Sequence, residues 1–199
     1  MVLGEVRGVF MQEVTLYSDG SSRGNPGPGG FGCVLQFRDR SGKLHELELS
    51  GGFTCTTNNR MELLGVITGL EALKRPCRVE VHSDSQYVVN AFNQHWVEGW
   101  LKRGWRNAGK QPVKNVDLWK RLLAAKEPHE VTFHWVKGHA GHPENERCDQ
   151  LATAAADAPD RQVDEGFAGE ERFACKGDPA RRPPPSFRGV SASRCNNRA

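Results

Sequence analysis

Hydrophobic and polar residues alternate along the first third of the chain in the way that β-strands require. A run of β-branched and aromatic residues predicts a strand over residues 14–19, and a loop rich in Gly and Pro follows it over 20–30. Two more strands are predicted over 31–38 and 44–50, with a turn at 39–42 between them. Because a short turn can join only antiparallel neighbours, we expect these three strands to form an antiparallel meander.

A spacing of three and four residues between apolar positions begins at Met61 and indicates a helix that ends before Pro76. On another face of this helix Gly65, Gly69 and Ala72 are small, so that face can lie close against a sheet. The later elements are a strand over 78–83, helices over 85–93, 96–105 and 115–126 (the last capped by Asn115), a strand over 130–137, and a final helix that Pro143 starts and Pro159 stops.

The resulting order, βββαβαααβα, predicts an α/β fold. The first, fourth and fifth strands are joined by helical crossovers, so we expect them to run parallel to one another. The prediction is a mixed five-stranded sheet with helices on its faces. It occupies residues 13–158, between a lead-in over 1–12 and a C-terminal tail over 159–199 whose Arg- and Pro-containing sequence lacks periodicity and is expected to be disordered.

Composition narrows the class of protein. Hydrophobic residues make up 37% of the chain, enough for a core, and no apolar run reaches the ~18 residues of a membrane span. The N-terminus does not resemble a signal peptide. The six cysteines, none in a CxxC pair, are expected to be reduced thiols in a cytoplasmic protein: Cys33, Cys55, Cys77, Cys148, Cys175 and Cys195.

The net charge is only +3, but it is unevenly distributed. Residues 96–121 contain seven Lys or Arg and only two acids, Glu98 and Asp117, which gives this segment a charge of 7 − 2 = +5. A local positive patch suits a polyanion that one region holds while another region cuts it.

Four carboxylates occupy informative positions. Asp19 ends the first strand and Asp84 ends the fourth, so both are expected at the edge of the sheet where ligand sites of α/β folds form. Glu62 lies early in the first helix and Asp149 early in the last. Carboxylates packed together resist ionising together unless a divalent cation joins them, and all-oxygen ligands select Mg²⁺ or Mn²⁺. Two such ions can clamp the attacking water and the leaving oxygen of a phosphodiester.

Each acid also has a simpler structural interpretation. The Asp19–Gly20 pair can form a turn, and Asp84 with Ser85 can begin a helix. Glu62 can be the partner of an Asn59 helix cap, and Asp149 can be a solvent-facing helix residue. The residues around the four acids decide between the two interpretations.

Six segments around these acids resemble the four motifs of type 1 ribonucleases H of the bacterial type. They are YSDGS at 17–21 with GNPGPGG at 24–30, TTNNRMEL at 56–63, SDSQYV at 83–88, and WVKGHAGH at 135–142 with NERCDQLA at 145–152. The resemblance covers about residues 13–158, with the motifs in the family's order and spacing.

The resemblance implies an endonuclease that hydrolyses the RNA strand of RNA·DNA hybrids and leaves 5′-phosphate and 3′-OH ends. Asp19, Glu62, Asp84 and Asp149 would hold one or two Mg²⁺ ions, with Mn²⁺ as the alternative. Glu62 would also lie near the ribose 2′-OH, which distinguishes RNA from DNA. His139, in a Gly-rich loop, would move protons or assist product release; the simpler interpretation is a plain loop histidine.

An aromatic and basic segment resembles the protrusion by which the bacterial enzymes grip the DNA strand. The residues expected to bind substrate there are Trp96, Trp100, Trp119, Lys102 and Arg103. Packing between helices is the alternative for the tryptophans, and it is expected to dominate for at least one of them. Gly99 and Leu101 replace residues that are often polar and basic in the bacterial enzymes.

Further substrate contacts are expected at the starts of two helices. Thr57 and Asn58 would bind a DNA phosphate, with helix capping as the alternative for both. Asn59 is also expected to bind substrate. Asn25 and Gln86 would reach the RNA strand. A zinc site formed by His139, His142 and Cys148 matches no regular zinc spacing.

Two other hypotheses apply to this fold. One is an integrase or resolvase that acts on DNA, and the protrusion and the set of Asn25, Thr57 and Gln86 argue against it. The other is a silent module that binds hybrids, which is not supported because all four acids are present. The sequence indicates no small-molecule cofactor and no membrane, and we expect a monomer.

Overall fold

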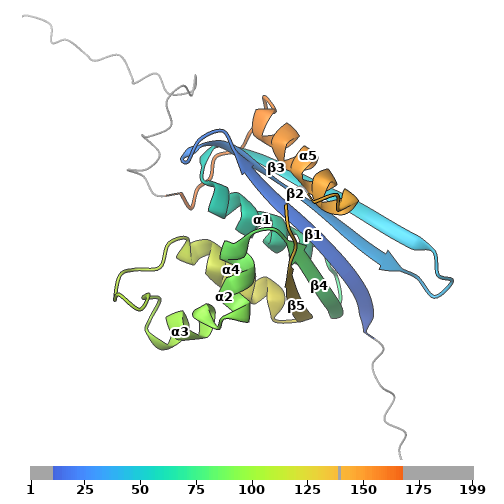
Figure 1. Cartoon of the computed structure of the whole chain (residues 1–199), viewed down its shortest axis with the longest axis horizontal. Helices are drawn as coiled ribbons and strands as arrows, with labels where there is room; N and C mark the ends of the chain where they lie inside the picture. Colours follow the sequence, from blue (N-terminus) through green and yellow to red (C-terminus); the bar gives the residue numbers. More distant parts are fainter. Residues whose placement is uncertain (1–10, 139, 168–199) are drawn as a thin grey trace, which may run out of the picture.

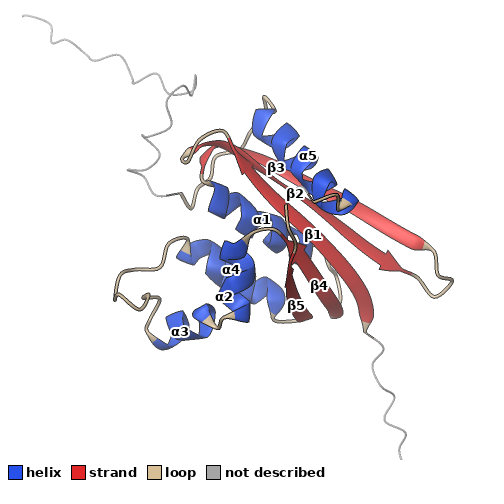
Figure 2. Cartoon of the chain, in the orientation of Figure 1, coloured by secondary structure: helices blue, strands red, loops and turns tan. Residues whose placement is uncertain are grey.

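The computed structural model describes residues 11–138 and 140–167 and has the predicted order of elements (Figures 1 and 2). The strands are β1 (Gln12–Ser22), β2 (Gly27–Arg38), β3 (Leu44–Thr56), β4 (Cys77–Ser83) and β5 (Glu130–Trp135). The helices are α1 (Asn58–Glu71), α2 (Gln86–Asn93), α3 (Trp96–Lys102), α4 (Val116–Lys126) and α5 (Pro143–Asp157). Among these helices none combines the length and apolarity needed to cross a membrane.

The five strands form one mixed sheet in the order β3-β2-β1-β4-β5. β1, β2 and β3 are antiparallel neighbours, whereas β4 pairs in parallel with both β1 and β5. The predicted meander and the predicted parallel strands are therefore confirmed. The parallel strands place their carboxyl ends at a common edge of the sheet.

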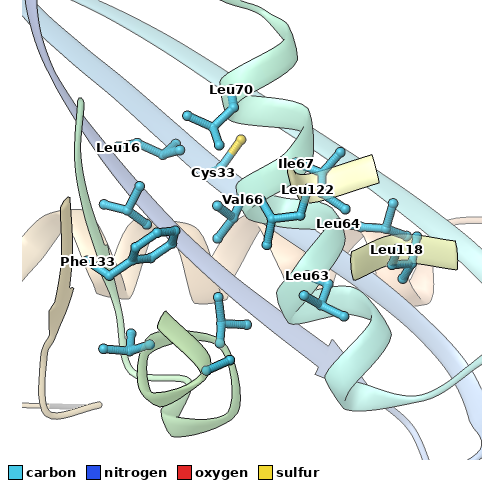
Figure 3. Close-up of a cluster of buried hydrophobic side chains, with 14 of the residues drawn as sticks. Leu16, Cys33, Leu63, Leu64, Val66, Ile67, Leu70, Leu118, Leu122 and Phe133 are labelled. Carbon is cyan, nitrogen blue, oxygen red and sulfur yellow. The ribbon is translucent and has the colours of Figure 1, made fainter. Parts of the chain in front are cut away.

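The main core lies between the sheet and α1. Figure 3 shows leucine and isoleucine side chains of α1 against Leu16, Cys33 and Phe133 of three strands and against Leu118 and Leu122 of α4. The small face of α1 makes this packing close, because a side chain at Gly69 would collide with Leu16. The prediction that this face lies against the sheet is confirmed at Gly65 and Gly69.

α5 covers the opposite face, over β2, β1 and β3. Gly30 and Gly32 of β2 lie against the backbone of α5 at Ala152 and Cys148, where any side chain would collide. These glycines explain a difference from the sequence prediction. Residues 20–30 were expected to form a loop, but β1 continues to Ser22 and β2 starts at Gly27. Here glycine provides space for a helix and does not break the strand.

Residues 159–167 also differ from the predicted disordered tail. Gln162 pairs with Phe53 of β3, and its backbone hydrogen-bonds with Gly52 and Thr54. Asp164 is 6% exposed and Phe167 is 3% exposed. This segment therefore extends the folded domain beyond α5. The predicted lead-in, apart from residues 11 and 12, and the tail from residue 168 onward lie outside the described residues.

The cysteines are not all thiols. Cys33, Cys77 and Cys148 are free and buried, as predicted. Cys55 is disulfide-bonded, so the prediction of a thiol is wrong at this position. The lack of a CxxC pair does not exclude a disulfide. Cys148 is fully buried, whereas His142 is exposed, which argues against a zinc site that they would share.

Candidate active site

Asp19 lies at the centre of the candidate site. It belongs to β1, one residue beyond Ser18, which is the last residue of β1 to pair with β4. On its other side it pairs with Gly32 of β2. The Asp19 side chain is 9% exposed, and its Oδ1 accepts a hydrogen bond of 2.7 Å from the backbone N–H of Gly20. The carboxylate is thus fixed at the edge of the sheet with little access to water.

Three other elements bring carboxylates to Asp19. Asp84 directly follows Ser83, which pairs with Ser18, so β4 delivers it next to the end of the parallel ladder. Gly20 lies against the backbone of α1 at Glu62, and Gly32 lies against the backbone carbonyl that precedes Asp149 in α5. The carboxylate cluster therefore comprises Asp19, Glu62, Asp84 and Asp149, from β1, α1, the end of β4 and α5.

The carboxylates of the cluster interact electrostatically. Burial raises the pKa of Asp19 to about 7, and the negative charges of Asp84, Asp149 and Glu62 add to the increase. Burial likewise raises the pKa of Glu62 to about 7, with a contribution from Asp84, while hydrogen bonds from Ser85 and Asn58 oppose the increase. At neutral pH the cluster consequently holds charge that a cation would stabilise.

Glu62 is held by two side chains that the sequence analysis did not assign to it. The side-chain amide of Asn58 donates to its Oε1 over 2.8 Å, and the hydroxyl of Ser85 donates to its Oε2. Ser85 also caps α2 by accepting from the backbone N–H of Val88. The alternative in which Glu62 serves an Asn59 cap is wrong, because α1 begins after Thr57.

The chemistry of the cluster fits hard divalent cations. Its donors are all carboxylate oxygens, the ligand type that Mg²⁺ and Mn²⁺ prefer. Among the residues that the structure describes, no three of these carboxylates bring ligand atoms within 4.8 Å of one another.

The start of α1 adjoins a cavity of about 410 Å³. Its lining includes Asn25, Thr57 and Asn59, which were predicted to bind substrate, together with Lys114 and Asn115. Thr57 is at the N-cap position of α1, but its side chain makes no capping hydrogen bond. The capping alternative is therefore wrong for the Thr57 hydroxyl, which is left available to a ligand.

Asn58 and Gln86 occupy the first residues of α1 and α2. The backbone N–H of Asn58 donates to Asn25 over 3.2 Å, which ties the β1–β2 loop to the start of α1. Gln86 is exposed one residue after Ser85. His139 lies outside the described residues, so its role stays a prediction; the preceding Gly138 lies against the Asp84 carboxylate.

The three tryptophans predicted to bind substrate have different environments. Trp119 is fully buried, and its indole N–H donates to the Tyr87 hydroxyl over 3.0 Å, so its assignment as a substrate-binding residue is wrong. Trp100 is 9% exposed and packs edge-on against Trp119, with ring centroids 5.2 Å apart. Trp96 is 36% exposed and remains a candidate surface for a nucleic-acid strand. Core packing thus dominates for two of the three.

Basic residues of the predicted patch lie on α3 and the loop after it, at one end of the molecule (Figure 1). Lys102 and Arg103 are both exposed. The Arg103 guanidinium lies over Gly99, where a side chain would collide with it, and its Nε donates to the carbonyl of Arg106. Gly99 therefore leaves room for the Arg103 guanidinium, although this flexible side chain could move aside for a larger residue.

A buried ionic network near the cluster was missed at the sequence level. Arg60 of α1 pairs with Asp117 of α4 and with Asp164, which follows α5. Asn115 is at the N-cap position of α4 as predicted, but it makes no capping bond; its side chain contacts Arg60 and Tyr87 instead. In the sequence, Arg60 stands within the motif at 56–63, and nothing near it in the chain indicates its two acidic partners.

Comparison with known proteins identifies the family and the fold of the chain. The RNase H family profile matches residues 11–157. The chain is 64% identical over 146 residues to a ribonuclease H of Lachnoclostridium phytofermentans, across 73% of this chain and 92% of that protein. It is similar to the solved structure of LC9-RNase H1, described as a type 1 RNase H with the type 2 active-site motif, with a TM-score of 0.68, 31% identity and coverage of 95% and 100%. It is also similar to LC11-RNase H1 in complex with an RNA/DNA hybrid, with a TM-score of 0.51, 26% identity and coverage of 72% and 96%.

Proposed function

The chain belongs to the ribonuclease H family, as a type 1 enzyme of the bacterial type, and we propose that its carboxylate cluster hydrolyses the RNA strand of RNA·DNA hybrids with divalent cations. The products would carry 5′-phosphate and 3′-OH ends. Family membership makes the protein a hydrolase of the ribonuclease H type. The metal dependence, the products and the roles of single residues belong to the proposal.

The observation that carries the proposal is the meeting of four carboxylates around Asp19. They come from four separate elements, and the pKa values of Asp19 and Glu62 are raised to about 7 by burial and mutual repulsion. A group of acids that disfavours its own ionisation is costly for folding and suits a site that receives cations. When bound, Mg²⁺ would supply charge compensation and an acidified water for attack on the phosphorus.

The protein's own residues would orient the substrate around this centre. Asn58 and Ser85 fix both oxygens of Glu62, which keeps that carboxylate in place for the ribose 2′-OH and for the attacking water. His139 would carry protons at the leaving oxygen or assist product release.

The substrate would run from the carboxylate cluster toward α3. Thr57, Asn58 and Asn59 at the start of α1 would bind a DNA phosphate, while Asn25 and Gln86 would contact the RNA strand. Lys102, Arg103 and Trp96 would grip the DNA strand further along. The similar LC11-RNase H1, solved with an RNA/DNA hybrid, supports hybrid as the substrate class. The monomeric state and the cytoplasmic location stay predictions from the sequence.

A substrate panel tests the proposal. Labelled RNA·DNA hybrid, duplex DNA and duplex RNA are each incubated with the protein in Mg²⁺ or in EDTA, and the product ends are mapped. The proposal expects Mg²⁺-dependent cleavage of the RNA strand in the hybrid alone. Cleavage of duplex DNA would instead indicate an integrase- or resolvase-like activity, and binding without cleavage would indicate a silent module.

A further inference from the structure

A second group of metal-ligating side chains lies on the sheet outside the carboxylate cluster. In β4 and β5 the side chains of Val79, Val81 and Phe133 point into the core beneath α1. Because side chains alternate along a strand, Glu80, His82 and His134 point to the opposite face. α5 covers that face over β1, β2 and β3 (Figure 1). On β4 and β5, Glu80 is exposed, whereas His82 and His134 are half-buried.

The pairing of the strands sets two imidazoles side by side. His82 and His134 are direct partners in the parallel ladder, and their rings stack with centroids 4.8 Å apart. Glu80 precedes His82 by two residues on the same face, and its Oε2 lies 4.0 Å from Nε2 of His82. One ligand atom from each of these three residues lies within 4.8 Å of the other two. Within the described part of the chain this is the one such group.

Packing alone does not account for this group. Tyr17 stacks on His82 with centroids 5.1 Å apart, so the three rings form a row across β1, β4 and β5. That row explains why the rings are parallel. It does not explain Nε2 of His134, which is buried and has no hydrogen-bond partner among the described residues. A buried nitrogen without a hydrogen-bond partner destabilises the fold through its lost hydration, and a bound ligand would compensate for that loss.

We propose that Glu80, His82 and His134 bind one zinc-class divalent cation at a site separate from the carboxylate cluster. Two imidazoles and one carboxylate are ligands that zinc takes, whereas Mg²⁺ prefers oxygen alone. Ligand atoms around tetrahedral zinc lie about 3.4 Å apart, because each bond is about 2.1 Å long. Glu80 is exposed and can rotate its carboxylate toward the ion. One imidazole would also have to turn out of the stack, because the two rings are only 21° from parallel and their in-plane lone pairs do not yet converge.

The surroundings favour a cation. The neighbouring positive charge, Arg78, is already engaged by Glu13 and Glu130 in ion pairs of 3.6 and 3.2 Å. Two residues at the start of α5 interact electrostatically with His82: Glu144, which adds negative charge, and His142, whose effect on the His82 pKa is opposite in sign. A bound ion would leave a coordination position for water and would link β4 to β5 across the ladder.

The test measures zinc binding by the full chain with the carboxylate cluster occupied or disabled. Protein stripped of metal is titrated calorimetrically with Zn²⁺ in excess Mg²⁺, as wild type and as the double variant Asp19→Asn/Glu62→Gln. We expect about one equivalent of Zn²⁺ in both. Absence of zinc binding in the wild type, or its loss in the double variant, would overturn the proposal, because the second result assigns the zinc to the carboxylate cluster.

Variants of the ligands locate the site. His134→Gln and Glu80→Gln are each expected to weaken Zn²⁺ binding by at least about tenfold. Co²⁺ in place of Zn²⁺ should show a visible spectrum of nitrogen ligation that His134→Gln loses. Glu80 is exposed, so its variant should fold normally, and unfolding curves without zinc check both proteins.

A matched control is His95→Asn. His95 pairs with Glu98 at 3.4 Å and its side chain is 80% exposed. Within the described residues it belongs to no group of three metal-ligating side chains. This variant should bind Zn²⁺ as the wild type does. Equal affinity in wild type, His134→Gln and Glu80→Gln would contradict the assignment. Because the readout is binding, it does not depend on nuclease activity.

Discussion

Asp164 accepts hydrogen bonds from Nε and Nη2 of Arg60 over 2.6 and 2.7 Å, although 104 positions separate the two residues in the chain. Their side chains are 5% and 3% exposed. Thr56, at the end of β3, donates its hydroxyl to the same carboxylate. Arg60 lies two residues before Glu62 in α1. The segment after α5 therefore stabilises the part of α1 that carries Glu62, a member of the carboxylate cluster.

Replacing Asp164 by Asn should destabilise the protein by about 3 kcal/mol, because it leaves a buried guanidinium with part of its charge uncompensated. Urea unfolding followed by circular dichroism measures the change. Asp160→Asn is the matched control, since Asp160 is an exposed acid of the same segment. Equal stability of the two variants would show that the buried pair does not hold the fold together.

This pair also marks the limit of the sequence analysis. The order of elements and the parallel β1–β4–β5 arrangement were predictable, because they depend on local periodicity and on the length of the connections. The packing of residues 159–167 was not, because those residues lack periodicity and become ordered only through distant partners such as Arg60 and Gly52. The continuation of β2 through Gly30 was missed for a similar reason. Its glycines are required because the backbone of α5 packs directly against them.

The same distinction applies to the candidate site. The four acids were found because they stand within long motifs whose spacing is visible along the chain. The burial of Trp119 was not visible, because a tryptophan among basic residues looks the same whether it faces solvent or the core. The Glu80–His82–His134 group depends on the register between β4 and β5, which only the folded sheet defines.

In the metal-free protein, stability should fall as pH rises from about 4 to about 7. The folded pKa values of Asp19 and Glu62 are raised to about 7, above the unfolded values near 4. The folded state therefore binds protons more tightly than the unfolded state, and ionisation through this window costs stability. Asp19→Asn should be more stable than the wild type at pH 8 in EDTA, by about 1 kcal/mol or more.

Unfolding curves at pH 5 and pH 8 measure this difference. The advantage of Asp19→Asn should shrink at pH 5, and added Mg²⁺ should stabilise the wild type more than the variant. Asp160→Asn should show neither effect. A variant less stable than the wild type at pH 8 without metal would mean that repulsion in the cluster is not significant.

Replacing Lys102 and Arg103 by Ala should raise KM for hybrid and flatten its dependence on salt. Each lost phosphate contact lowers the slope of log K against log salt by about 0.9. The control is Arg40→Ala/Lys43→Ala, which removes two exposed charges from the β2–β3 turn at the far end of the molecule (Figure 1). If both double variants lower the salt slope equally, Lys102 and Arg103 contribute no more to hybrid binding than other exposed charges.

Trp96 and Trp119 should give opposite results. Trp119→Phe should lower the free energy of unfolding by about 2 kcal/mol, because it opens a cavity and removes one of the two hydrogen-bond donors to the Tyr87 hydroxyl, while KM stays unchanged. Trp96→Ala should raise KM about fivefold or more through lost stacking, with little change in stability. Steady-state kinetics and urea unfolding on both variants separate the roles. An increase in KM for Trp119→Phe in a fully folded protein would restore its assignment to the substrate surface.

The carboxylate cluster is tested most directly by Asp19→Asn on a single RNA·DNA hybrid, with binding and single-turnover cleavage measured on the same preparation in Mg²⁺. Cleavage should fall by about 1,000-fold or more, the scale on which a cooperating catalytic group is lost, while the hybrid Kd changes little. Cleavage at a rate near that of the wild type, with the hybrid bound normally, would contradict the account.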